Sequence, residues 1–362
     1  MIILLRSTDG EPDSRFEKYT DFLRKKQLSY FTLCWDRMGK KIQTDNNLYY
    51  QKKAKYGDGI KNIIGLIGFN WFLIRKLICL RKKYRVIHAC DFDTIFPAIL
   101  LKIFFRKKVI YDIFDWYIDS RGISNPLIRK SLLVCEYINI KLSDVVIVCE
   151  EERIPQIIYT PSKIWVLPNI PYFKDIDFPK EQTKCLTLSY VGILMNFRGI
   201  DKIVKYAKAN PNIRLKVAGF GTLESLFTSE EMSENIEYYG AVKYLDGLKI
   251  MNSSDIICAI YEKNNPNHIY AAPNKYYEGL YLGKPIITTE GTLVGNKTAA
   301  NKTGFVIGES YENLKSLLDN LQKAQIQKYS ENAQNLWLNK YKDYVLNFFE
   351  CEYFPFIMKS NE

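Results

Sequence analysis

Segments typical of strands and helices alternate along both halves of this chain, and the alternation limits the folds available to it. The first half begins with a buried strand over residues 1–6, a polar turn and a helix over about 15–26. The second half begins in the same order, with a strand over 186–191, a glycine turn and a helix over 200–209. This order is typical of parallel α/β sheets. The sequence therefore predicts an α/β protein with two Rossmann-like domains.

The length and the composition agree with two domains. The chain has 362 residues, and 47% of them are hydrophobic, which is enough for two cores. We expect a first domain over 1–175, a second over 176–330, and a C-terminal helix over 331–362. Residues 172–184 are rich in Lys, Asp and Pro and are predicted to form the linker. The eight cysteines include no Cys-x-x-Cys pair, which argues against zinc ribbons and disulfide frameworks.

One short helix carries most of the chemical information. Residues 273–285 are Pro-Asn-Lys-Tyr-Tyr-Glu-Gly-Leu-Tyr-Leu-Gly-Lys-Pro. Pro273 suits a helix start and Gly283 suits a helix end. Lys275 and Glu278 are three residues apart, so they share one helix face. Free N–H groups and a lysine can bind phosphate, and a carboxylate can accept two ribose hydroxyl protons. The stretch therefore predicts a site for a sugar nucleotide.

This pattern closely resembles the donor-site helix of the family 4 group of GT-B glycosyltransferases. The resemblance implies that Asn274 and Lys275 bind the donor and that Glu278 binds its ribose. Many members carry a second glutamate eight positions earlier, which holds the donor sugar, and Tyr270 stands there in this chain. It further implies the GT-B fold, in which two Rossmann-like domains face a cleft and the C-terminal helix crosses back to the first domain. The expected substrate is a nucleotide-diphosphate sugar, with no cofactor and no metal.

The glycine turn of the second half also resembles that family. Gly192 follows a strand, and the turn ends in Arg198-Gly199 just before a helix. In the family this loop binds the donor diphosphate and carries two basic positions. Here Ile193 occupies the first position and Arg198 keeps the second, so Arg198 is expected to bind the diphosphate. Gly219 and Gly221, after the next strand, match glycines that lie near the nucleotide.

Two polar turns of the first half follow buried strands. The first contains Asp91 and Asp93, directly after a strand over 86–90. Open α/β sheets bind ligands at such carboxyl ends, so both are expected to contact the acceptor. Paired aspartates can also hold a divalent metal, but an isolated Asp-x-Asp is a weak signal. Because the donor motif lies in the other half, capping of the next helix by Asp91 is the other interpretation.

The second polar turn follows a strand over 107–111 and contains Asp115 and Trp116. Asp115 is expected to orient or deprotonate the acceptor hydroxyl, and Trp116 to contact the acceptor. Many members of the family have a histidine where Phe114 stands, so this chain lacks that base. Gly10, in the turn after the first strand, could let the backbone approach the acceptor or could simply permit the turn.

Charge divides the chain into two unequal halves. Residues 1–175 hold 30 Lys and Arg against 19 Asp and Glu, an excess of 11, whereas the remaining 21 of each cancel. The excess indicates an anionic partner for the first half. Residues 60–85 combine aliphatic and aromatic residues with a basic end. They could form a packing helix or could lie on an anionic membrane, since the uncharged run over 62–74 is too short to span a bilayer.

Together these observations predict a glycosyltransferase that transfers a sugar to a lipid-linked saccharide in polysaccharide synthesis, for example of a capsule. It would use retaining chemistry, act at the cytoplasmic face of an anionic membrane, and bind no nucleic acid. Arg198, Lys275 and Asp115 would be its catalytic residues. Two alternatives remain: a nucleotide-sugar 2-epimerase of related fold, and a non-catalytic basic scaffold that binds membrane or RNA.

Overall fold

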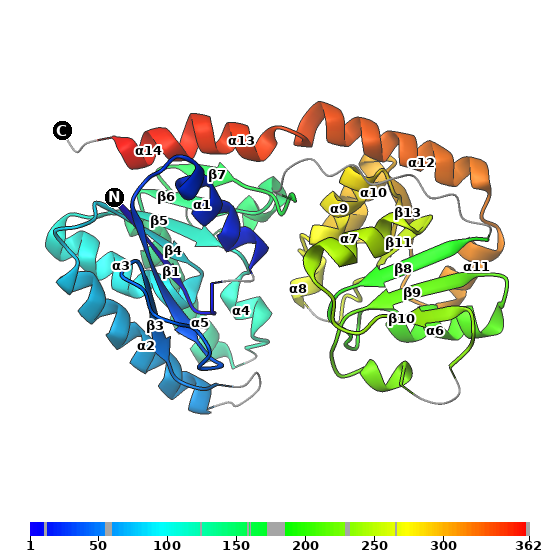
Figure 1. The fold of residues 1–362 in the computed structure, drawn as a ribbon, viewed down its shortest axis with the longest axis horizontal. Coiled ribbons are helices and arrows are strands. Elements are labelled where there is room, and N and C mark those ends of the chain that lie inside the picture. Colours follow the sequence, from blue (N-terminus) through cyan, green and yellow to red (C-terminus); the bar gives the residue numbers. More distant parts are fainter. Residues whose placement is uncertain are drawn as a thin grey trace. The chain divides into compact units, whose positions relative to one another are not determined.

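The computed structural model describes residues 1–10, 13–54, 60–123, 125–157, 159, 161–171, 185–228, 232–264 and 266–359. The chain forms two compact units (Figure 1). The first unit contains residues 1–168 and 345–362, and the second contains residues 169–344. Each unit has its own parallel sheet, which agrees with the predicted Rossmann-like pair.

The first unit is built on a sheet of seven parallel strands within the described ranges, in the order β3-β2-β1-β4-β5-β6-β7. The order reverses between β1 and β4, which is a topological switch point. The strands are β1 (Ile2–Arg6), β2 (Tyr30–Asp36), β3 (Asn47–Gln51), β4 (Val86–Cys90), β5 (Lys108–Ile113), β6 (Val145–Val148) and β7 (Ile164–Val166). The helices are α1 (Ser14–Lys25), α2 (Ile60–Cys79), α3 (Phe92–Phe105), α4 (Tyr117–Ser120) and α5 (Pro126–Leu142), followed by the 3₁₀ helix Glu151–Gln156.

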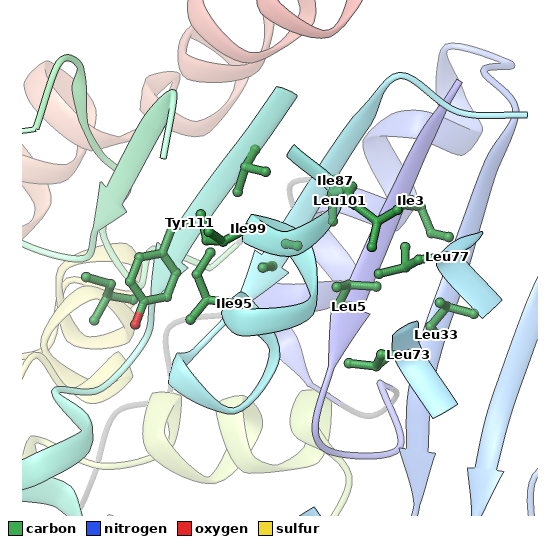
Figure 2. Close-up of a cluster of buried hydrophobic side chains, with 14 of the residues drawn as sticks. Ile3, Leu5, Leu33, Leu73, Leu77, Ile87, Ile95, Ile99, Leu101 and Tyr111 are labelled. Atoms are coloured by element: carbon green, nitrogen blue, oxygen red, sulfur yellow. The ribbon is translucent and has the colours of Figure 1, made fainter. Parts of the chain in front are cut away.

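Helices α2, α3 and α5 cover one face of this sheet. Figure 2 shows part of this core: Leu73 and Leu77 of α2 lie near Leu5 of β1, and Ile95 of α3 lies near Tyr111 of β5. Alternate strand residues point to opposite faces, so the other face is covered separately. On that face α1 packs against the C-terminal segment. Phe22 of α1 stacks on Phe349 of the C-terminal segment, with ring centroids 4.5 Å apart.

Residues 36–59 are polar and have no clear period, so their sequence predicts a long loop and does not predict the strand β3. Residues Asn47–Gln51 instead pair in parallel with β2 at the edge of the sheet. Tyr50 packs beside Trp35 and Phe69, with ring centroids 5.7 and 6.0 Å away. The residues of β3 do not alternate clearly between apolar and polar. The strand forms because of its partners from β2 and α2, which the local sequence does not show.

The helix predicted within residues 60–85 is α2, and it is longer than its uncharged core. The uncharged run over 62–74 is itself too short to span a bilayer, but the longer window Asn62–Cys79 is long and apolar enough to cross a membrane by length and composition. Length and composition are weak grounds for a membrane span. One side of α2 also contributes Phe69, Leu73 and Leu77, all fully buried, to the core of the first unit. The helix is therefore a packed element of the α/β fold.

The second unit has six parallel strands in its described residues, in the order β10-β9-β8-β11-β12-β13, with the reversal between β8 and β11. The strands are β8 (Thr187–Val191), β9 (Arg214–Ala218), β10 (Ile236–Tyr238), β11 (Ile256–Ala259), β12 (Ile286–Thr289) and β13 (Gly304–Ile307). The helices are α6 (Ile200–Ala209), α7 (Tyr244–Asn252), α8 (Pro266–Ile269), α9 (Asn274–Leu282), α10 (Leu293–Asn301), α11 (Tyr311–Asp319) and α12 (Lys323–Leu336), with a 3₁₀ turn over Glu224–Leu226.

The C-terminal helices belong to both units. Helix α12 and the π-helical turn Trp337–Tyr341 pack in the second unit, where Trp337 contacts Tyr281. Helix α13 (Tyr344–Phe348), the π-helical turn Phe349–Tyr353 and α14 (Phe354–Met358) follow. The chain returns to the first unit at Val345, later than the predicted residue 331. The predicted boundary after residue 175 and the linker 172–184 lie outside the described residues.

Candidate functional site

The loops that follow β8 and β9 lie backbone against backbone. The amide of Gly192 donates to the carbonyl of Ala218 over 2.9 Å, and that of Leu194 donates to Phe220 over 2.8 Å. Gly192, Gly219 and Gly221 all have φ near +148°. A Cβ on Gly219 would lie 1.8 Å from the Gly192 carbonyl oxygen. Glycine is therefore required for this close approach, and the three predicted glycines lie together.

Helix α9 has the predicted ends. Pro273 is the residue before its first turn, Asn274 is the first helical residue, and Gly283 ends the helix in the left-handed conformation at φ +63°. No side chain caps the N-terminus of α9. The first turn therefore presents Asn274 and Lys275 at a helix N-terminus, where the helix dipole places partial positive charge.

Lys275 points from α9 toward the glycine loop. Its ammonium nitrogen lies 4.8 Å from the centroid of the Tyr190 ring, and a Cβ on Gly192 would be only 2.8 Å from it. Burial opposes the charge, but Tyr261, Tyr190 and Glu278 outweigh burial and raise the pKa of Lys275. Lys275 makes no ion pair among the residues that the structure describes. It is a charged lysine without a carboxylate at ion-pair distance in the described residues.

Arg198 lies in the same place at the start of α6. Its guanidinium carbon is 4.7 Å from the centroid of the Tyr261 ring, and its buried Nε has no hydrogen-bond partner in the described part of the chain. Arg198 is close enough to Lys275 to oppose its charge, and it also lowers the pKa of His268, for which burial is the larger cause. Two cations held together without an anion indicate an anion-binding site.

The N-terminus of α6 adds to this site. Gly199 precedes α6 in the left-handed conformation, and no side chain caps the helix. The helix has ten residues, so its dipole places partial positive charge beside Arg198. Arg198 follows β8, and Tyr261 and His268 follow β11, the two strands between which the sheet order reverses. The predicted donor residues thus converge at the switch point of the second sheet.

Glu278 is buried on α9, one helical turn after Lys275. The hydroxyl of Tyr244, the first residue of α7, hydrogen-bonds to its carboxylate. Burial and this carboxylate raise the pKa of Tyr244, so its hydroxyl stays protonated and donates. No sequence signal pointed to Tyr244, because only the packing of α7 beside α9 brings it to Glu278.

In the first unit, Asp91 organises the carboxyl ends of β1, β4 and β5. Its carboxylate pairs with Arg6 and accepts hydrogen bonds from the amides of Phe114, at 2.9 Å, and Asp115, at 3.4 Å. It does not cap α3, so that interpretation was wrong. Burial is the main cause that raises the pKa of Asp91 to about 6. The negative charges of Asp115 and Asp93 also contribute to the rise, and the positive charge of Arg6 opposes it. Its φ of +66° is strained for a non-glycine residue.

The other predicted acceptor residues are placed differently from one another. Asp93 is buried, accepts a hydrogen bond from Ser7 over 3.0 Å, and keeps Oδ1 without a partner within the described ranges. Asp115 is exposed and lies 3.7 Å from Arg153. Trp116 packs into the hydrophobic core, so its ring serves packing and not the expected contact. A Cβ on Gly10 would lie 2.9 Å from Cys34 Sγ, so Gly10 is a buried turn glycine.

Phe114, where the family often has a histidine, lies between two arginines. The guanidinium carbon of Arg6 is 4.1 Å from its ring centroid, and that of Arg15 is 4.9 Å away. Arg6 is a residue that the sequence reasoning missed, although a charge directly after four apolar residues of β1 could have identified it. Asp91, Asp93 and Asp115, with the adjacent Arg6, thus form the polar end of the first sheet.

His88, Cys90 and Asp112 are the group whose donor atoms are close enough to hold a metal among the described residues. All three are buried, and Asp112 is already paired with Arg15 over 2.7 Å. Burial raises the pKa of the Cys90 thiol well above its ordinary value, so the thiolate ligand is disfavoured. This group does not fit a metal. It is a buried hydrogen-bond network that Tyr353 joins through His88 Nδ1.

Comparison with known proteins adds an independent finding for the second unit. Residues 173–336 match the family described as "Glycosyl transferases group 1". No curated protein sequence is significantly similar to the chain.

Solved structures of similar fold extend over the whole chain. A sucrose-phosphate synthase from Thermosynechococcus elongatus is 13% identical, covers 99% of this chain and 100% of its own, and has a TM-score of 0.72. WaaG, a glycosyltransferase involved in lipopolysaccharide biosynthesis, is 14% identical, with coverage of 99% and 100% and a TM-score of 0.72. Anabaena HepE in complex with UDP and glucose is 11% identical, with coverage of 98% and 99% and a TM-score of 0.69.

At these identities the structures show the fold, and the predicted GT-B class is confirmed. The family match lies within the second unit, the unit in which Arg198, Lys275 and Glu278 converge. Together the comparisons show the GT-B fold over the chain and a match of residues 173–336 to a glycosyltransferase family.

Proposed function

We propose that this chain is a retaining, metal-independent glycosyltransferase that transfers a sugar from a nucleotide-diphosphate sugar to a lipid-linked saccharide. The observation that carries the proposal is the convergence of Arg198 and Lys275 beside Glu278. Neither cation forms an ion pair in the described part of the chain, and Arg198 directly precedes Gly199 and the uncapped N-terminus of α6. A nucleoside diphosphate supplies the missing negative charge, and its ribose supplies hydroxyls for Glu278.

The reaction follows from this charge distribution. The bond between the anomeric carbon and the phosphate oxygen breaks, and its electron pair leaves with the nucleoside diphosphate. Arg198, Lys275 and the α6 N–H groups stabilise that developing charge, which is commonly the largest catalytic effect. They do so without a metal. The acceptor oxygen bonds to the anomeric carbon, and its proton passes to Asp115 or to the departing phosphate oxygen.

The first unit binds the acceptor in this proposal. Asp115 is the exposed carboxylate of its polar end, and Asp91 holds the backbone amide of Asp115. Oδ1 of Asp93 has no hydrogen-bond partner among the described residues. A saccharide hydroxyl could donate to this oxygen after a small rearrangement. Asp115 orients or deprotonates the acceptor hydroxyl, and Asp91 is a positioning residue that fixes the loop carrying it.

The acceptor is lipid-linked and belongs to a surface polysaccharide pathway in this proposal. The excess of 11 positive charges lies in residues 1–175, so the acceptor-binding part of the chain is drawn to an anionic membrane surface. The transfer reaction would take place at the inner face of the cell membrane, with no nucleic-acid partner. The structural likeness to WaaG, a lipopolysaccharide glycosyltransferase, supports this choice of pathway.

A binding and turnover experiment tests the proposal. Thermal shift with a panel of nucleotide sugars, in the presence of a chelator, should identify a donor that raises the melting temperature of the wild type. Arg198→Ala and Glu278→Ala should each reduce that shift. NMR of the product formed with a lipid-linked acceptor should show the donor's anomeric configuration retained.

Other outcomes assign other functions. Isomerised donor without any acceptor would show a 2-epimerase. A wild-type protein that binds no nucleotide, but binds lipid or RNA, would show a scaffold. Dependence of the donor shift on a divalent metal would contradict the metal-independent mechanism.

A further inference from the structure

Helix α2 is apolar on both of its long sides. Phe69, Leu73 and Leu77 face the sheet and are fully buried. On the opposite side Ile67 is 67% exposed and Trp71 is 62% exposed. An amphipathic helix of a water-soluble domain normally places polar residues on its outer side. The outer side of α2 is therefore built to contact something apolar.

The neighbouring helices extend this surface. Helix α2 packs beside α3, and α3 packs beside α5, on the same face of the first sheet (Figure 1). Phe104 of α3 is 72% exposed and Leu127 of α5 is 76% exposed. We name the whole set of exposed apolar residues on these helices the outer face: Ile63, Ile64, Ile67, Trp71, Ile78, Phe96, Ile103, Phe104, Phe105, Leu127, Ile128, Val134 and Ile138.

Charge around the outer face has one sign. The sequence contains no Asp or Glu from residue 60 to residue 90. Asp93 of α3 and Glu136 of α5 are both buried. Asp119, which precedes α5, is paired with Arg129, and Asp144, which follows α5, is paired with Lys102. Cations without a carboxylate partner in the described residues remain at Arg75, Arg81, Lys82, Lys83, Arg106, Lys130 and Lys141.

Cations and aromatic residues meet where α2 and α3 end. The guanidinium carbon of Arg81 lies 5.7 Å from the ring centroid of Phe105. Lys107 donates to the carbonyl of Arg81 over 2.6 Å, which ties the turn after α2 to the end of α3. Ile78 and Phe104 are exposed beside these residues in the sequence. Aromatic and aliphatic side chains next to Lys and Arg are the composition that favours the boundary of an anionic bilayer.

We infer that the outer face of α2, α3 and α5 is the surface with which this chain docks on an anionic lipid bilayer. A second copy of the chain fits it less well, because an isologous contact would bring like cations together. A bilayer-spanning α2 is disfavoured, because its other side is committed to the core. The inference names the membrane contact of the proposed function, but it stands on the surface alone.

Flotation of the purified full chain tests this surface. Vesicles of phosphatidylcholine alone are compared with vesicles of phosphatidylcholine and phosphatidylglycerol. The wild type should float with the anionic vesicles only. The double variant Ile67→Glu with Trp71→Glu should bind them at least about tenfold more weakly, because two large apolar contacts are lost. The matched control, Leu338→Glu with Leu346→Glu, changes two exposed leucines on the C-terminal helices and should float as the wild type does.

A charge variant separates the basic rim from the apolar surface. Arg81→Gln, Lys82→Gln and Lys83→Gln combined should weaken binding at least about tenfold at low salt, and less at high salt. The control removes three cations from the second unit: Lys323→Gln, Lys328→Gln and Lys340→Gln. It should keep wild-type flotation.

Three results would overturn the inference. They are a wild type that does not float, an Ile67/Trp71 variant that floats as well as the wild type, and a lipid-free dimer that the same variant dissociates. Circular dichroism melting checks that the variants are folded. The donor-induced thermal shift is measured in parallel: its absence from a wild type that floats would count against the proposed function and leave the docking surface in place.

Discussion

The ammonium of Lys275 occupies the space that a side chain at Gly192 would need, because a Cβ on the glycine would lie 2.8 Å from Nζ. Lys275 comes from α9 and Gly192 from the loop after β8, so the contact joins the two predicted donor motifs. A glycine 83 positions before a lysine thus determines where the lysine's charge lies.

Gly192→Ala should displace Lys275 and weaken binding of a nucleoside diphosphate at least about tenfold, since tenfold corresponds to roughly 1.4 kcal/mol. It should also cost about 1–3 kcal/mol of folding stability, because φ there is +148°. Calorimetry and denaturant unfolding measure the two effects. Gly122→Ala is the control, since its φ is also positive but nothing lies within 4 Å of the added Cβ. Unchanged affinity in Gly192→Ala would contradict the role given to this contact.

Removing either cation should affect phosphate binding selectively. Lys275→Gln and Arg198→Gln should each weaken the binding of UDP about ten- to a hundredfold, because a hydrogen bond to a charged group contributes about 1.5–3 kcal/mol. Uridine, which has no phosphate, should bind the variants and the wild type alike. Lys208→Gln, an exposed lysine at the end of α6, should change neither affinity. Equal losses for UDP and uridine would show that these cations do not meet the diphosphate.

Glu278 should distinguish ribose from deoxyribose. The wild type should bind UDP more tightly than 2′-deoxyuridine diphosphate, and Glu278→Gln should lose most of that preference. Tyr244→Phe should reduce the preference partly, because the tyrosine hydroxyl fixes the carboxylate. Isothermal titration of both ligands to all three proteins forms a double-mutant cycle. A wild type that binds both ligands equally would remove the ribose role of Glu278.

Glu136 should make folding stability depend on pH. Burial raises its pKa from an ordinary value of 4.5 to about 7, while Tyr111 donates to Oε1 over 2.7 Å. The folded protein then keeps a proton that the unfolded chain loses, so stability falls as pH rises from 4.5 to 7, by roughly 3 kcal/mol at most. Glu136→Gln should reduce that slope in urea unfolding at several pH values and leave the smaller part that Asp91 contributes through its own raised pKa. Exposed Glu152→Gln should keep it, and a wild type without the slope would contradict the prediction.

The donor helix was predictable from sequence because its signals are local. Pro273 and Gly283 mark the ends of α9 by their own backbone preferences, and the spacing of Lys275 and Glu278 follows from helix geometry. The strands β1, β4, β5 and β6 were predictable for a similar reason, since buried parallel strands are short apolar runs. Edge strand β3 was missed because its residues are half-buried and depend on β2 for pairing.

The acceptor side was harder to predict because packing decides it. Trp116 and Asp115 are adjacent in sequence, yet one is in the core and the other is exposed. Asp91 was expected to cap a helix or touch the acceptor; its side chain makes no capping hydrogen bond and holds Arg6 and the Phe114 amide, while the acceptor contact stays a prediction. Those partners lie 85 and 23 positions away along the chain, beyond the range of any local signal.

By itself the sequence determined the α/β class, the two Rossmann-like units, the helix that carries Lys275 and Glu278, and the basic character of the first half. These depend on apolar periodicity, on glycine and proline preferences and on net charge, which belong to short segments or to composition. Tertiary structure decided that Tyr244 meets Glu278, that Arg198 and Lys275 form no ion pair among the described residues, and that α2 buries one apolar side and exposes the other. Each depends on which segments the sheet brings together, because contact and burial exist only once the strands have paired.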